Sequence, residues 1–261
     1  MGGAARAGAA AGSLALAAAL WWTSGAVDLG RAPALDGARA SRLWDEAVAA
    51  RAAGRTAASL SAVERLLASF PNEPRYLELE AQELENAGRF RDAARSWELY
   101  LRTAPFPTEA CATLGRDYAR AGLPERQIDA DRRCLALDPS KTDQMVTLGL
   151  ALERADRDRE AESLLREALA RAPNDADAGV GLIRLLLKRG ALAEARARSA
   201  GLLASQPDDT DVLLSAAQVA RAAGDLPRAR ALLEKAIRAS PGYEDLYRVL
   251  AGVESQQGDA A

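Results

Sequence analysis

The chain has 261 residues and a formal net charge of −3, which gives no support to nucleic-acid binding because that function needs a clustered basic excess. It has no histidine and only two cysteines, which removes the commonest general base, the Ser-His and Cys-His nucleophile pairs and a four-cysteine metal site. No nucleophile motif or phosphate loop is present either, so we expect no catalytic activity, no cofactor and no metal.

The first 26 residues form an N-terminal segment with three possible roles. After Arg6, an Ala- and Leu-rich apolar stretch runs for about 14 residues, which is shorter than the roughly 20 residues of a membrane span. It suits the apolar region of a secretory signal peptide, and residues 23–26 are small enough for cleavage. An uncleaved membrane anchor and an untargeted leader are the alternatives. We therefore expect a protein that is exported to, or anchored in, the periplasm or cell envelope, with a cytoplasmic location as the alternative.

Two regular series of residues divide the rest of the chain. Prolines recur every 34 residues, and a second series of mostly glycines lies halfway between them. Proline cannot continue a helix through its own position, and glycine supplies the left-handed backbone of a helix C-cap, so each period is predicted to hold two helices. The prolines are Pro71, Pro105, Pro139, Pro173, Pro207 and Pro241, and the second series is Gly54, Gly88, Gly122, Asp156, Gly190, Gly224 and Gly258.

The segments between these residues have the apolar spacing of helices. Before Gly224, for example, Leu213, Ala217 and Ala220 recur at i, i+4 and i+7. Polar residues at 140, 174 and 208 follow the prolines and are predicted N-caps of the next helices. A single helical hairpin cannot bury its apolar face alone, so we expect neighbouring hairpins to stack into a solenoid.

The period, the prolines and the glycines resemble the tetratricopeptide repeat family. Small residues also occur where that family packs its helices closely, in first helices (Ala47, Ala81, Gly115, Gly149, Ala217, Ala251) and in second helices (Ala93, Ala161, Ala195, Ala229). The resemblance implies an all-α fold, a right-handed superhelical solenoid of helix–turn–helix repeats. It predicts a linker at 27–39, six repeats of 34 residues at 40–243, and a capping helix and tail at 244–261, whose polar residues 254–257 would face solvent.

The third repeat differs from the others in its second helix. Gln127 and Asp131 occur where other repeats have alanine, leucine or tryptophan. This helix could be rotated and partly solvated, or Asp131 could make a polar contact inside the hairpin with Tyr118 or Arg116. Cys111 and Cys134 should lie at similar heights on the two antiparallel helices. They could form a disulfide if the chain is exported, or serve as small apolar packing residues.

The stretch at 153–162 has eight charged residues in ten, with acids at alternate positions as in the start of a calcium loop. However, Asp156 occupies the glycine place of the fourth repeat, and the second helix should begin before such a loop could be completed. We interpret the stretch as a solvated connector between two helices. Asp156 must then either adopt or avoid a backbone conformation that glycine adopts freely.

The family resemblance also implies a concave groove lined by the first helix of each repeat. From the third repeat onward this face mixes aliphatic residues with arginine or lysine, which suits a protein or peptide segment with apolar and acidic residues. No asparagine occupies the places with which one subclass of the family clamps a terminal carboxylate. The predicted groove residues are Arg116, Arg120, Val146, Leu150, Arg184, Leu187, Lys188, Leu214 and Arg221.

The sequence therefore predicts a non-catalytic adaptor or assembly scaffold, which the N-terminus could tether to a membrane. A regulatory or docking subunit of an envelope enzyme complex, acting on polysaccharide or protein, is the second hypothesis. An enzyme is the third hypothesis and lacks a supporting motif. Neither the partner nor the oligomeric state follows from the sequence.

Overall fold

The computed structural model describes residues 35–103 and 108–258, and this part of the chain is all helical, without strands. The helices form six consecutive hairpins, α2–α3, α4–α5, α6–α7, α8–α9, α10–α11 and α12–α13, followed by α14. Their bounds are α2 Gly37–Ala52, α3 Thr56–Ser69, α4 Pro74–Asn86, α5 Phe90–Thr103, α6 Thr108–Arg120, α7 Pro124–Leu137, α8 Thr142–Arg154, α9 Asp158–Arg171, α10 Ala176–Lys188, α11 Leu192–Ser205, α12 Thr210–Ala222, α13 Leu226–Ala239 and α14 Glu244–Gly258.

The turns inside the hairpins explain the regular glycine series. Gly54, Gly88, Gly122, Gly190 and Gly224 all have φ between 68° and 78°, a left-handed conformation that costs glycine little. Asp156 has φ 56° and is the only non-glycine residue with positive φ among the described residues. An aspartate can adopt this conformation at a cost of about 1 kcal/mol. The fourth hairpin therefore turns like the others although it lacks the glycine.

The helix N-termini differ from the expected caps by one residue. Asp175 and Asp209 cap α10 and α12, each accepting a hydrogen bond from the backbone N–H three residues later, at 2.8 and 2.9 Å. The predicted caps at 174 and 208 lie one position too early. Lys141 precedes α8 and makes no side-chain cap bond, so the prediction for residue 140 is also wrong. Aspartate at the later position aims its carboxylate at the free N–H groups of the first turn.

The core lies between the two helices of each hairpin and between successive hairpins. Most of the small residues expected at close contacts are fully buried, whereas Ala251 is exposed on the last helix. Large side chains fill the space that glycines leave open: a Cβ on Gly149 would lie 2.8 Å from Leu165, and one on Gly179 would lie 2.8 Å from Leu202. The larger side chains are thus accommodated by glycine on the facing helix.

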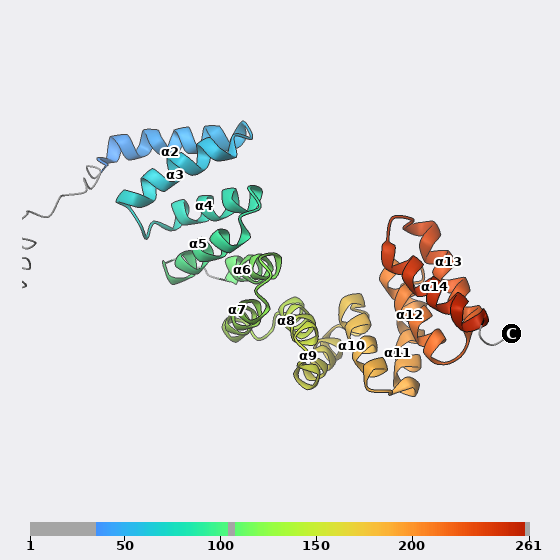
Figure 1. Cartoon of the computed structure of the whole chain (residues 1–261). Coiled ribbons are helices and arrows are strands. Elements are labelled where there is room, and N and C mark those ends of the chain that lie inside the picture. The colour runs from blue at the N-terminus through green and yellow to red at the C-terminus, as the bar shows by residue number, and fades with distance from the viewer. Residues whose placement is uncertain (1–34, 104–107, 259–261) are drawn as a thin grey trace, which may run out of the picture.

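The hairpins follow one another along a curved path, from α2 at one end to α14 at the other (Figure 1). In the C-terminal half the first helices pack directly on each other, because α10 contacts both α8 and α12. Helix α14 covers the end of this array with the buried residues Leu246, Val249 and Val253, while Glu254, Ser255 and Gln256 are exposed on it. The structure is an all-α helical repeat solenoid.

Ion pairs connect the second helices of neighbouring hairpins. Arg132 of α7 pairs with Glu160 of α9 at 2.5 Å, and Arg166 of α9 pairs with Glu194 of α11 at 2.6 Å. Each pair spans 28 residues, so the pairing repeats with the hairpins. These residues are exposed, and each pair therefore contributes little to stability.

No helix within residues 35–103 and 108–258 is long and apolar enough to cross a membrane. The N-terminal segment for which the sequence predicts a signal peptide or anchor lies outside the described residues.

Candidate binding groove

The predicted groove residues lie on α6, α8, α10 and α12, the first helices of four successive hairpins. Val146, Val180 and Leu214 recur every 34 residues and form one row along these helices. Their side chains are only 5, 9 and 8 % exposed, so they belong mainly to the core. Val146 and Leu214 can at most form the floor of a groove.

Leu150 and Leu187 are the two predicted aliphatic residues that remain half-buried. Leu150 on α8 reaches over Gly181 on α10, where a Cβ would lie 2.6 Å from its Cδ2 atom. Leu187 packs at the edge of the same core cluster. These leucines therefore offer apolar surface along α8 and α10 that a bound segment could cover.

Two of the predicted cationic residues are already paired with acids. Arg184 donates from Nε and Nη2 to the two carboxylate oxygens of Glu153, at 2.7 and 2.5 Å. Lys188 donates to Asp156 at 2.7 Å and to Asp158 at 3.0 Å. These bonds join α10 to the end of α8, to the turn after it and to the first residue of α9. They reduce the positive charge that Arg184 and Lys188 can offer to a partner.

The other three predicted cations lie toward the two ends of the groove. Arg116, Arg120 and Arg221 form no ion pair with any described residue. Arg120 lies with its guanidinium 5.2 Å from the ring centroid of Phe90, a cation–π contact. Arg221 lies beside Gly252 of α14, where a Cβ would be 2.7 Å from its Nη1 atom. Among the predicted groove residues, all of which the structure describes, these three arginines are the cations that form no ion pair.

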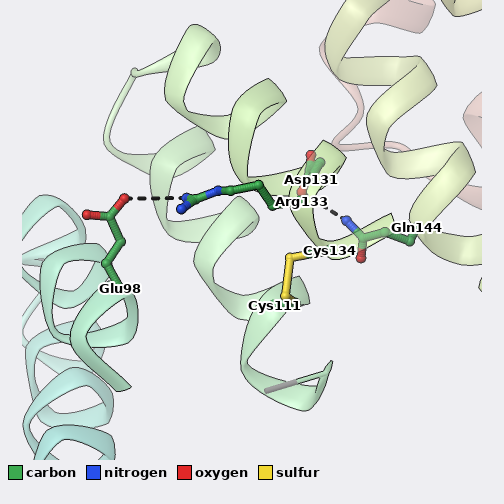
Figure 2. Close-up of a disulfide and its surroundings, with 6 residues drawn as sticks. All are labelled: Glu98, Cys111, Asp131, Arg133, Cys134 and Gln144. Carbon is green, nitrogen blue, oxygen red and sulfur yellow. Dashed lines mark hydrogen bonds and ion pairs between the residues drawn. A yellow bond between two sulfur atoms is a disulfide. The ribbon is translucent and has the colours of Figure 1, made fainter. Parts of the chain in front are cut away.

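The third hairpin contains a disulfide between Cys111 on α6 and Cys134 on α7, with a Cα–Cα distance of 5.5 Å (Figure 2). Of the two alternatives for these cysteines, the structure has the bridge. Both residues are buried, at 3 and 6 % exposure. The bridge ties α6 to α7 across the hairpin.

Asp131 is fully buried next to this bridge, and its partners differ from those expected. It accepts a hydrogen bond from Gln144 at 2.9 Å (Figure 2). It also accepts one from Gln127 at 3.3 Å, and none from Tyr118 or Arg116. Gln144 belongs to α8, so this bond links the third hairpin to the fourth. Gly115 provides the space, because a Cβ there would lie 2.0 Å from Asp131 Oδ1. Gln127 is also buried, so the alternative of a partly solvated helix is wrong.

Burial changes the acidity of this carboxyl group. Desolvation raises the pKa of Asp131 from 3.8 to about 6, and the two glutamine hydrogen bonds only partly oppose this effect. The group is therefore mostly ionised at neutral pH and accepts both amide hydrogen bonds. This arrangement stabilises the hairpin junction and offers no reactive group.

The charged stretch at 153–162 forms the end of α8, the turn at Asp156 and the start of α9. Helix α9 begins at Asp158, so no open loop of calcium-binding length exists there. Among the described residues, no group of three or more acidic or cysteine side chains is arranged to hold a metal ion. The stretch connects two helices and supplies partners for Lys188.

Sequence reasoning missed two buried acids on the first helices α4 and α6. Asp117 on α6 is fully buried and lies one 34-residue period after Glu83, another buried acid. The equivalent residues in later repeats are Ala151, Leu185 and Val219. A comparison of equivalent places along the repeats could have singled out both acids.

Comparison with protein families gives two matches to models described as tetratricopeptide repeat, at residues 150–219 and 210–253. No curated protein sequence matches the chain. Several solved structures have a similar fold at low sequence identity. MamA is 20 % identical with a TM-score of 0.57, and the match covers 65 % of this chain and 92 % of MamA. YrrB, a TPR protein with an unusual peptide-binding site, is 18 % identical with a TM-score of 0.54, and the match covers 72 % of this chain and 97 % of YrrB. A tetratricopeptide repeat protein from Parabacteroides merdae is 16 % identical with a TM-score of 0.56, and the match covers 86 % of this chain and 88 % of that protein.

Proposed function

Because the chain is a tetratricopeptide repeat protein, we propose that it is a non-catalytic adaptor or scaffold that binds a protein or peptide segment along α6, α8, α10 and α12. The observation that carries the proposal is the half-buried pair Leu150 and Leu187 above the buried row of Val146, Val180 and Leu214. Both leucines pack against the core on one side and leave apolar surface accessible on the other. A partner segment would cover it and gain free energy from the burial.

The charges beside these leucines suggest the chemistry of the partner. Arg116, Arg120 and Arg221 are without acidic partners among the described residues and would pair with acidic groups of the segment. Arg184 and Lys188, which are held by Glu153, Asp156 and Asp158, would contribute less. The segment would therefore combine aliphatic residues with acidic groups toward its two ends.

We propose that this activity belongs to the cell envelope, a proposal supported by the N-terminal sequence and the disulfide. A structural disulfide persists mainly in oxidising compartments, and residues 1–26 have the composition of a signal or anchor. N-terminal sequencing of the mature protein tests this location, because an intact Met1 would argue against a cleaved signal.

The binding proposal can be tested with displayed peptides. Random peptides of about 12 residues, long enough when extended to cross three or four hairpins, would be selected on the full-length chain. We expect the selected peptides to combine aliphatic and acidic residues. Replacing both leucines (Leu150→Ala with Leu187→Ala) should weaken the best peptide by about tenfold or more, because several buried methylene groups are lost.

The matched control is Leu164→Ala, which truncates a half-buried leucine on α9, outside the predicted groove. It should leave peptide affinity unchanged, and circular dichroism would verify that all variants stay folded. If no peptide is enriched, or if the double variant binds like the original chain, the groove is not the binding site.

A further inference from the structure

A pocket of about 490 Å³ opens between α11, α12 and α13, in the C-terminal half of the solenoid. The buried residues Ala216, Val219 and Ala220 of α12 line its base. Arg196 on α11 and Arg228 on α13 line its two sides and are exposed. Because these sides belong to second helices, the pocket is separate from the proposed groove, and none of the groove residues lines it.

Small side chains account for the space. Ala216 and Ala220 each occupy a place that is leucine in the two preceding repeats, and Ser199 occupies a place that is leucine in α9 and α13. These leucines are all buried: Leu148 and Leu182, Leu152 and Leu186, and Leu165 and Leu233. Three truncated side chains thus meet at one place, and the volume that they leave is the pocket.

Ser199 also introduces a polar group into this place. The residue is only 6 % exposed, yet it lines the pocket. Its hydroxyl group makes no hydrogen bond with any other described residue. Buried hydroxyl groups normally have such a partner, and a polar group of a ligand in the pocket would supply it.

The two arginines of the pocket lack acidic partners. Neither Arg196 nor Arg228 forms an ion pair within residues 35–103 and 108–258. Asp225 lines the pocket as well, but its carboxylate caps α13 and accepts a hydrogen bond from the backbone N–H of Arg228 at 3.2 Å. The pocket therefore holds two guanidinium groups against one carboxylate, and its net charge is positive.

The preceding pair of second helices shows what such a place can hold. Arg166 on α9 pairs with Glu162 one turn earlier and with Glu194 on α11, the latter at 2.6 Å. One cation thus lies between two acids and joins two neighbouring hairpins.

In the pocket the same arrangement recurs with opposite charges and without its central group. Arg196 and Arg228 lie one 34-residue period after the two acids, and Ala200 lies one period after the central arginine. All three line the pocket. An acidic group over Ala200 would lie between two guanidinium groups, as Arg166 lies between two carboxylates.

We propose that this pocket binds a glutamate side chain of a protein partner, with the carboxylate between Arg196 and Arg228. Guanidinium groups donate paired hydrogen bonds to carboxylates, and the hydroxyl group of Ser199 offers a further donor. The methylene groups of the glutamate and an aliphatic neighbour would cover the base formed by α12. The solenoid would then have a second binding surface, which does not depend on the groove.

The experiment is an NMR titration of the full-length chain, labelled with ¹³C in the alanine methyl groups. Ala197 and Ala200 line the pocket on α11, and their signals are identified by their loss in Ala197→Gly and Ala200→Gly. The probe is acetyl-Leu-Glu-Leu amide, whose only charge is the glutamate carboxylate. We expect saturable shifts of both signals with this peptide, and at least about tenfold weaker binding of acetyl-Leu-Gln-Leu amide, which has the same shape without the charge.

Two variants locate the site. Arg228→Gln should weaken binding of the glutamate peptide by about tenfold or more, because one of the two guanidinium groups is lost. Arg238→Gln is the matched control: Arg238 is also exposed on α13 and forms no ion pair with the part of the chain that the structure describes, but it lies outside the pocket. It should leave the affinity unchanged.

A second measurement needs no ligand. Ala200→Glu would place a carboxylate on the chain itself between the two arginines, so it should raise the melting temperature by about 1–4 °C over Ala200→Gln, which adds the same shape without charge. Ala200→Glu should also abolish the binding of the glutamate peptide, because the added side chain fills the site.

Three results would overturn the pocket: equal affinity for the glutamine peptide, unchanged binding in Arg228→Gln, or equal melting temperatures of the two variants at Ala200. The groove could also attract an aliphatic and acidic peptide, so the titration is repeated with Leu150→Ala combined with Leu187→Ala. We expect the shifts at Ala197 and Ala200 to persist. Their loss in that variant would mean that the peptide binds the groove, and the pocket would then fail while the proposed function stands.

Discussion

Reducing the disulfide between Cys111 and Cys134 should loosen the third hairpin more than any other part of the chain. The bridge closes a loop with a sequence separation of 23. In the chain-entropy description, a crosslink of this loop length stabilises the folded state by about 3 kcal/mol. In a repeat array each hairpin contacts only its neighbours, so most of this loss should appear as local opening of α6 and α7.

Amide hydrogen exchange measured peptide by peptide can test this expectation. A loss of about 3 kcal/mol corresponds to exchange about a hundredfold faster in α6 and α7 after reduction. Helices α12 and α13 do not contact this hairpin and should change by less than about threefold. The double variant Cys111→Ala with Cys134→Ala should behave like the reduced chain, which would exclude an effect of free thiols.

Two results would refute the reasoning. Unchanged exchange in α6 and α7 would mean that packing alone holds this hairpin closed. An equal acceleration in every helix would mean that the described solenoid unfolds as one cooperative unit, and the local picture would then be wrong.

Two further predictions concern the buried acids of the same hairpin. Gly115→Ala should destabilise the protein by about 1–3 kcal/mol, because its Cβ would lie 2.0 Å from the tightly held carboxylate of Asp131. Gly201→Ala, in α11 with open space around it, should instead stabilise by about 0.5–1 kcal/mol, and denaturant unfolding would measure both. Burial raises the pKa of Asp117 to about 7 in the folded chain. Below about pH 4 the group is protonated in both the folded and the unfolded chain. As pH rises from 4 toward 7 only the unfolded chain loses this proton readily, so the free energy of unfolding should fall by about 2–4 kcal/mol. Asp117→Asn should therefore flatten the melting temperature between pH 5 and 8; a slope like that of the original chain would exclude Asp117 as its source.

The regular spacing of proline and glycine was sufficient to predict the fold. Proline and glycine act on the backbone of their own residues, so their effect does not depend on distant contacts. Helices α4, α6, α8, α10 and α12 indeed begin 34 residues apart. Even the exception was informative, because Asp156 takes the left-handed conformation of the glycines.

The contacts between hairpins were harder to predict. The sequence indicated that Asp131 needs a partner, but it could not indicate that Gln144 of the next hairpin provides it. Val146 and Leu214 lie on the expected face, yet packing within the core clusters buries them. Such details depend on how two hairpins pack, and several side chains decide that packing together.

The hydrogen bond from Gln144 to Asp131 also limits how the length of this protein can change. Repeat proteins evolve largely by gaining or losing whole units, because each unit contacts only its neighbours. A rearrangement between α7 and α8 would separate a buried carboxylate from its buried amide donor and leave both without a partner. The third and fourth hairpins should therefore be inherited together. Natural variants of different length, or shortened forms made in the laboratory, should keep this junction and change elsewhere.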